Sequence, residues 1–114
     1  MAGSELSGLS VRQLHARRRR LAGALQSLEA TLRGVLVSDG RRCSSSGCRC
    51  RRGELHGPYL YLALYSGGRS RTIYVPAAVA EVVEEHVRAT QRNEALLSEI
   101  AQVNLELLRR RALG

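Results

Sequence analysis

The stretch PYLYLALYSGGRSRTIYVP, residues 58–76, decides the fold of this chain. Its first half alternates between two kinds of side chain, which is the period-two pattern of a β-strand with two different faces. Gly67-Gly68 suits a two-residue turn, after which Ile73 and Val75 return to the leucine face. Residues 58–75 are therefore predicted to form a β-hairpin. The leucine face holds Leu60, Leu62 and Leu64, and the opposite face holds Tyr59, Tyr61 and Tyr65.

A hairpin of two strands is marginally stable alone, so its leucine face must pack on other elements, which we expect to be helices. N-terminal to it, Ser10 and Gln13 have the spacing of a capping box. Apolar residues then recur at alternating intervals of three and four, which is a heptad pattern. The pattern predicts a helix over residues 10–37. Residues 1–9 are rich in Gly and Ser and are expected to be flexible.

C-terminal to the hairpin, Pro76 suits the first turn of a helix. The residues that follow repeat the three-four spacing and predict a second long helix over 76–112. Two polar residues, His86 and Asn93, fall in this seam and are interpreted as fixing its register. The seam consists of Val79, Val82, His86, Ala89, Asn93, Leu96, Ile100, Val103 and Leu107.

The 114 residues suffice for one domain. The predicted fold is α+β and mostly α. It consists of two long antiparallel coiled-coil-like helices that flank a Cys/His knuckle (residues 38–57) and a two-stranded β-hairpin.

All three cysteines of the chain, Cys43, Cys48 and Cys50, lie in this knuckle segment, and His56 follows them. An odd number of closely spaced cysteines does not suit a disulfide framework. Three sulfur donors and one nitrogen donor do suit the tetrahedral coordination of structural zinc. We therefore predict a zinc site at these four residues. Two alternatives stay open: reduced cysteines in a basic loop, and a redox-sensing thiol cluster.

Arginines surround the cysteines and recur on the hairpin. Forked guanidinium groups on a rigid knob suit phosphates, and exposed tyrosines can stack on bases. A solvated basic loop, an anionic protein or lipid surface, and tyrosines that merely pack along the hairpin are the alternatives. The predicted nucleic-acid-binding residues are Arg41, Arg42, Arg49, Arg51, Arg52, Arg69, Arg71, Tyr59 and Tyr61.

A separate run of four arginines, Arg17 to Arg20, lies in the first predicted helix. Four consecutive helical residues point in all directions, so the run does not make a one-sided patch. Arg18 takes a seam position, where Glu94 or Glu99 of the second helix is the expected partner. A phosphate contact is the alternative for this run.

The order of motifs from Cys43 to Pro76 resembles a family of small bacterial and archaeal proteins classed as a domain of unknown function. Its members are similar in having C-x4-C-x-C, then His-Gly-Pro-Tyr, a hairpin with a glycine turn, Tyr-Val-Pro and a long helix. The resemblance covers roughly residues 30–110 and implies no established activity. It mildly favours association with nucleic acid.

Charge and motifs narrow the function. The net charge is +8, and residues 1–57 hold eleven Arg against four acids, whereas residues 58–114 hold seven against six. Such an excess favours polyanionic partners. No paired carboxylates or nucleophile–base pattern predicts an enzyme.

The start of the chain does not resemble a signal peptide, and no apolar run approaches a membrane span. We therefore expect a cytoplasmic protein without a membrane partner. The predicted function is a zinc-stabilised accessory protein that binds DNA or RNA. The alternative is a coiled-coil adaptor that binds a partner protein, or a second copy of the chain, through the C-terminal helix.

Overall fold

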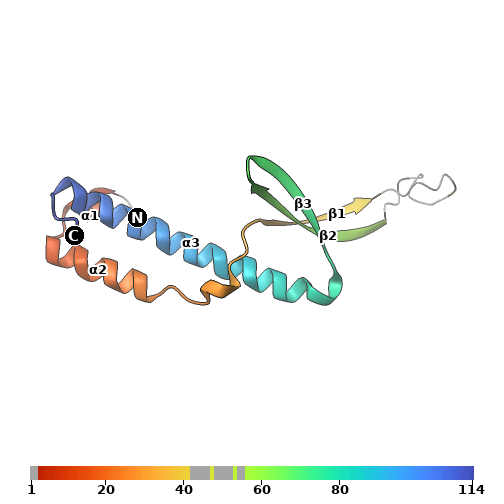
Figure 1. Cartoon of the computed structure of the whole chain (residues 1–114), viewed down its shortest axis with the longest axis horizontal. Helices are drawn as coiled ribbons and strands as arrows, with labels where there is room; N and C mark the ends of the chain where they lie inside the picture. The colour runs from red at the N-terminus through yellow and green to blue at the C-terminus, as the bar shows by residue number, and fades with distance from the viewer. Residues whose placement is uncertain (1–2, 42–46, 48–52, 54–55) are drawn as a thin grey trace. The chain divides into compact units, whose positions relative to one another are not determined.

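A computed structural model describes residues 3–41, 47, 53 and 56–114, and these residues have an α+β fold (Figure 1). The described part divides into two compact units, Met1–Ala30 with Ala89–Gly114, and Thr31–Arg88. The elements are α1 (Gly3–Ser7), α2 (Val11–Gly23), a 3-10 turn (Leu28–Ala30), β1 (Val35–Arg41), β2 (His56–Ser66), β3 (Arg69–Val75), a second 3-10 turn (Ala77–Val79) and α3 (Ala80–Arg109).

The prediction of a helix over residues 10–37 is correct only at its start. Ser10 and Gln13 form the expected capping box: the Ser10 Oγ accepts a hydrogen bond from the Gln13 backbone N at 3.1 Å, and the Gln13 Oε1 accepts one from the Ser10 N at 2.8 Å. The helix then ends at Gly23. Ser27 has a left-handed backbone, with φ of 53°, which a continuing helix does not allow. Two long coiled-coil helices are therefore absent from the described residues.

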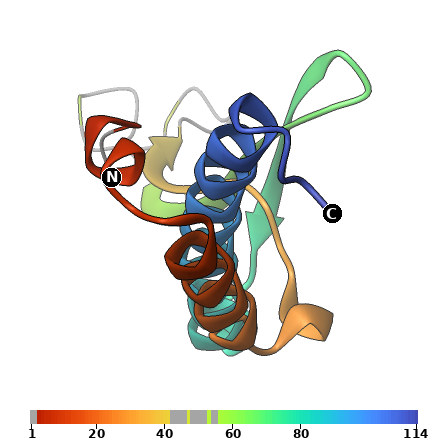
Figure 2. The same ribbon diagram turned by 90° about the vertical axis from the view of Figure 1, so that its left-hand side faces the viewer.

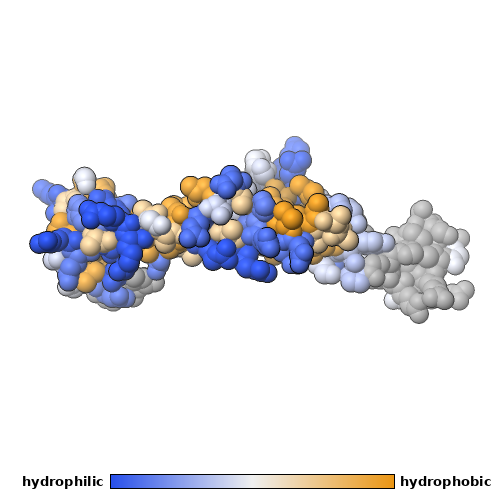
Figure 3. Space-filling view, turned by 90° about the horizontal axis from the view of Figure 1, so that it is seen from below, coloured by the Kyte–Doolittle hydropathy of each residue, from blue (hydrophilic) through white to orange (hydrophobic). Residues whose placement is uncertain are grey.

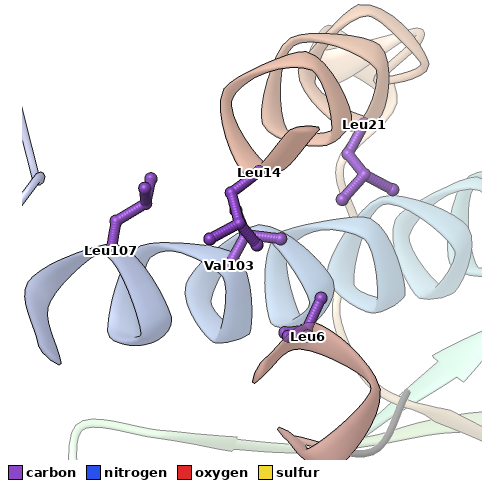
Figure 4. Close-up of a cluster of buried hydrophobic side chains, with 5 residues drawn as sticks. All are labelled: Leu6, Leu14, Leu21, Val103 and Leu107. Atoms are coloured by element: carbon purple, nitrogen blue, oxygen red, sulfur yellow. The ribbon is translucent and has the colours of Figure 1, made fainter. Parts of the chain in front are cut away.

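In the first unit, α2 runs antiparallel to the C-terminal part of α3, as expected for the two helices (Figures 1 and 2). The Arg18 Nη1 donates to the Asn104 Oδ1 at 2.9 Å, whereas Gln26, further along the chain, bonds Asn93. Arg18 therefore pairs with an amide and a backbone carbonyl (that of Gly114), not with Glu94 or Glu99. The core between the elements contains Leu6, Leu14, Leu21, Val103 and Leu107 (Figure 4).

The side chain of Asn93 bonds the backbone of the segment that follows α2. Its Nδ2 donates to the Gln26 carbonyl at 2.7 Å, and its Oδ1 accepts from the Gln26 N at 3.3 Å. Asn93 is buried, so this side chain satisfies two backbone groups that helix bonds would otherwise use. The polar seam residue thus makes a specific contact across the antiparallel pair.

The N-terminal residues expected to be flexible include α1. Leu6 is 1% exposed in the core. Arg110 donates to the backbone carbonyls of Leu6, Ser7 and Leu9, which lie at and beyond the end of α1. Its Nε also donates to the buried Glu106 carboxylate at 2.8 Å. This arginine therefore holds the N-terminal residues onto α3.

Replacing Arg110 with Met is expected to lower the free energy of unfolding by about 1–3 kcal/mol, because several charge-assisted hydrogen bonds are lost and Glu106 loses a partner. Urea denaturation followed by circular dichroism measures the change. Arg111→Met is the control, since Arg111 is exposed, and it should change stability by less than about 0.5 kcal/mol. Equal effects of the two substitutions would contradict this role.

The second unit contains an antiparallel sheet of three described strands in the order β1-β2-β3. The predicted hairpin is confirmed: Leu60 pairs with Val75 and Leu62 with Ile73. Gly67 and Gly68 form the turn with φ of 59° and 78°, and such a pair of positive angles is typical of a type I′ turn. The strand β1 was not predicted, and it extends the two-stranded hairpin to a larger sheet.

The leucine face of the sheet packs on the N-terminal part of α3. Leu62, Val75 and Val87 are buried together, and Val83 lies against them. Here the residues that pack on the sheet are not those of the predicted seam. Val79 and Val82, which belong to that seam, are 43% and 52% exposed. Figure 3 shows apolar and hydrophilic side chains mixed on the surface of this unit. The other polar seam residue, His86, is half-buried, and its Nδ1 lies 2.8 Å from the Val82 carbonyl oxygen of its own helix.

Gly34 lies directly before β1. Its φ is 144°, and a Cβ at this position would lie 2.7 Å from the Leu62 Cδ1 and 3.0 Å from the Ala63 carbonyl oxygen. A residue with a side chain would therefore strain the backbone and displace the sheet core.

Gly34→Ala is expected to destabilise the protein by about 1–3 kcal/mol, because of backbone strain and overpacking. The same substitution at Gly23 is a matched control, since a Cβ there meets no atom within 4 Å. It should be neutral or stabilise by up to about 1 kcal/mol, because alanine favours the helix. Thermal unfolding of both variants tests the contrast, and a stable Gly34→Ala protein would refute it.

Candidate nucleic-acid interface

The sheet face opposite α3 carries the tyrosines, as the alternation predicted. The register places Tyr61 beside Tyr74 on β3 and beside Val37 on β1. Tyr59 and Tyr74 are 37% and 52% exposed, and Tyr65, nearer the turn, is 75% exposed.

Three of these rings form one cluster, which we call the tyrosine platform: Tyr59, Tyr61 and Tyr74. Tyr74 lies at its centre, with its ring centroid 6.2 Å from that of Tyr59 and 5.8 Å from that of Tyr61. The ring planes meet at 74° and 62°, so both contacts are edge-to-face. The predicted site contained two members of the platform and omitted Tyr74, which strand pairing brings to Tyr61.

Val35 and Val37 of β1 extend the exposed face beside the platform, at 62% and 42% exposure. Sequence reasoning missed both because the spacing of apolar residues assigned them to a helix. The signal that favours a strand is the run of Val35, Leu36 and Val37 directly after a glycine, since β-branched residues are enriched in strands.

A cavity of about 340 Å³ adjoins the platform at the C-terminal end of β3, where Val75 pairs with Leu60 of β2. Tyr59 and Tyr74 form part of its wall. This volume is at the lower end of the range of about 300–1,000 Å³ that is usual for small-ligand pockets. No charged side chain contributes to its wall, so the cavity favours a planar, largely apolar group. The remaining lining residues are Pro58, Leu60, Val75, Ala77 and Ala80.

Arg69 and Arg71 do not join the platform. Arg71 pairs with Leu64 and Arg69 with Ser66, so both belong to the leucine-face positions of the register, near the turn. Arg69 therefore lies roughly 20 Å along the sheet from Tyr59, given the rise of a strand residue. The structure thus separates Arg69 and Arg71 from Tyr59, which the sequence had assigned to the same site.

The predicted metal ligands Cys43, Cys48 and Cys50 lie outside the described residues, as do Arg42, Arg49, Arg51 and Arg52. The structure does place the two ends of this segment: Arg41 of β1 pairs with His56 of β2, beyond a register shift that follows Asp39. The sequence between them therefore leaves and re-enters the sheet at one end, the end that carries Tyr59.

Among the side chains that the structure describes, no group of three or more His, Cys, Asp and Glu residues is placed to hold a metal ion. Within the same residues, no helix combines the length and the apolar character that crossing a membrane requires.

The four consecutive arginines of α2, Arg17 to Arg20, differ in their surroundings. Arg17 forms an ion pair with Glu5 at 3.4 Å, and Arg18 bonds Asn104. Arg19 and Arg20 are exposed. At least half of the run is thus engaged within its own unit, as expected for residues that point in different directions around a helix.

The fold and the platform define a small α+β protein in which one sheet face packs on a helix and the other is open. The chain belongs to a family described as a domain of unknown function (DUF6788), which matches residues 11–85. A search of curated proteins and a search of solved structures found no match.

Proposed function

We propose that this protein is a small, non-catalytic module that binds DNA or RNA at the end of the sheet where β1 and β2 meet, and that zinc stabilises the segment between these strands. The observation that carries the proposal is the pairing of Arg41 with His56 beside the tyrosine platform. Both ends of an arginine-rich segment are thereby held at the edge of an exposed aromatic surface.

Electrostatics supports a polyanionic partner. The segment from Arg41 to Arg52 contains five arginines and no acidic residue. The segment follows directly on β1, and the chain re-enters the sheet at His56, which pairs with Arg41. A local positive charge next to aromatic rings combines the two contacts that nucleic acid offers, phosphates and base faces.

The protein is expected to bind a labelled oligonucleotide at low salt, with log K falling linearly against log salt concentration because counterions are released. Fluorescence anisotropy measures this dependence. The double variant Arg51→Gln/Arg52→Gln should reduce the slope by about 1 for each phosphate contact that is lost. Arg88→Gln/Arg92→Gln removes the same charge from exposed positions on α3 and should keep the slope close to that of the wild type. Absence of any binding at low salt would end the proposal.

Zinc would be held by Cys43, Cys48, Cys50 and His56, whose sulfur and nitrogen donors match the ligand number of a structural site. The pairing of His56 with Arg41 supports this set, because it brings His56 to the strand end from which the cysteine segment departs.

Protein purified without added metal is expected to contain about one zinc ion per chain, because four donors close a structural site. Cys48→Ser should abolish this zinc while most helical circular dichroism remains, since α2 and α3 pack through a separate core. Ser45→Ala, in the same segment, should retain the metal. Metal-free native protein whose thiols are all alkylated at the unfolded rate would refute the site.

A second candidate is a protein-interaction adaptor that uses α3. The residues from Leu96 to Leu107 that face α1 and α2 are occupied by the chain's own core, so only the outer stripe is available. Leu97, Leu105 and Leu108 in that stripe are 46%, 46% and 56% exposed. Such binding would depend little on salt, and Leu105→Gln should abolish it while leaving oligonucleotide binding intact.

A further inference from the structure

We infer that the tyrosine platform binds unpaired bases, so that the nucleic acid this protein prefers is single-stranded. The inference rests on the proposed function and gives it a substrate class. Its basis is the aromatic cluster, the adjoining cavity and the distribution of charge around them.

Ring orientation provides the first argument. Tyr74 meets Tyr59 and Tyr61 edge-to-face, so neither pair is stacked in parallel. Tyr59 and Tyr74 are 37% and 52% exposed, so part of each ring is accessible to a ligand. A nucleic-acid base can stack on such a ring only when its own face is free, as in a single strand, whereas a duplex buries base faces in its interior.

The cavity provides the second argument. Its wall combines the rings of Tyr59 and Tyr74 with the aliphatic side chains of Leu60, Val75 and Ala80. An aromatic and aliphatic wall without charge suits the flat surface of a base and does not suit a phosphate. An unpaired base can turn out of a strand into such a space at a small cost, while a paired base must first break its pair.

Charge provides the third argument. In the sheet register, the ionisable side chain directly beside the platform is Asp39, which pairs with Tyr59 and is exposed. The platform therefore contributes stacking and repels phosphates slightly, so phosphate contacts must come from elsewhere. Eleven of the chain's arginines lie in residues 1–57, and Arg41 and Arg42 stand at and directly after the end of β1 in the sequence. This division between stacking rings and nearby cations is typical of single-strand binding proteins.

The test compares three labelled probes of the same length, about 12 nucleotides: a single strand, the matching duplex, and a single strand in which the central nucleotides are abasic. The abasic strand keeps the phosphates and lacks the base faces. Affinities of the folded, full-length protein are measured by anisotropy at one salt concentration. A 2-aminopurine placed in the single strand reports stacking directly through its fluorescence.

Tight binding of the intact single strand, with at least about fivefold weaker binding of both other probes, is the expected result. Tyr74→Leu should reduce affinity for the single strand at least about fivefold, to the level of the abasic probe, and Tyr74→Phe should restore it. Tyr65→Leu is the matched control on the same face, because Tyr65 lies outside the platform, and it should bind like the wild type. Circular dichroism and thermal unfolding verify that each variant is folded.

Asp39→Asn adds a test with the opposite sign. Removing this negative charge should tighten binding of the single strand, since the repulsion between the carboxylate and the phosphates is lost. If the platform instead recognised a cationic or proline-rich peptide, Asp39→Asn would weaken the binding of that peptide or leave it unchanged.

The outcomes separate the two proposals. Equal affinity for all three probes, without a fluorescence change and without sensitivity to Tyr74→Leu, would overturn the inference and leave the proposed function intact. Absence of binding to every probe at low salt would overturn both. If Tyr74→Leu does not fold, the comparison of intact and abasic strands with the wild-type protein still decides the question.

Discussion

The helix α3 is the constraint on which the rest of the structure depends, because it supplies one side of both hydrophobic cores. Val87 in its N-terminal part is buried against Leu62 and Val75 of the sheet, and Val103 and Leu107 in its C-terminal part are buried against α1 and α2. The short helix α2 is marginal in isolation, and the leucine face of the sheet is buried by packing on α3. A chain without Phe or Trp thus obtains two thin cores from one long element.

Patterns of neighbouring residues correctly predicted the parts of the secondary structure that depend on local contacts. The Gly67-Gly68 turn, the capping box at Ser10 and the alternation of leucine and tyrosine along β2 all appear in the structure. The helix expected to continue past Gly23 failed because Leu25, Leu28, Leu32 and Val35 follow a helical spacing, although they lie in separate elements. After the helix, Gln26 bonds Asn93, sixty-seven positions away, and no local pattern contains such a contact.

The candidate site, like the fold, was predictable only where local patterns determine it. Period-two alternation correctly placed Tyr59 and Tyr61 on the face opposite the leucines. The contact of Tyr74 with Tyr61 and the addition of the valines of β1 required the pairing of strands, which depends on long-range packing. Arg69 and Arg71 were predicted to share a nucleic-acid site with Tyr59. Strand length and the parity of the register separate them from Tyr59.

The two outer strands of the described sheet have a further consequence for the behaviour of the protein in solution. Both β1 and β3 are edges, and unpaired edges readily recruit strands from other molecules. Two features oppose such recruitment: the register shift between Asp39 and Arg41 interrupts a regular ladder along β1, and Arg69 and Arg71 place cations along β3. Crowded copies of this chain would thus repel one another along β3, which favours dispersed molecules over fibrous aggregates.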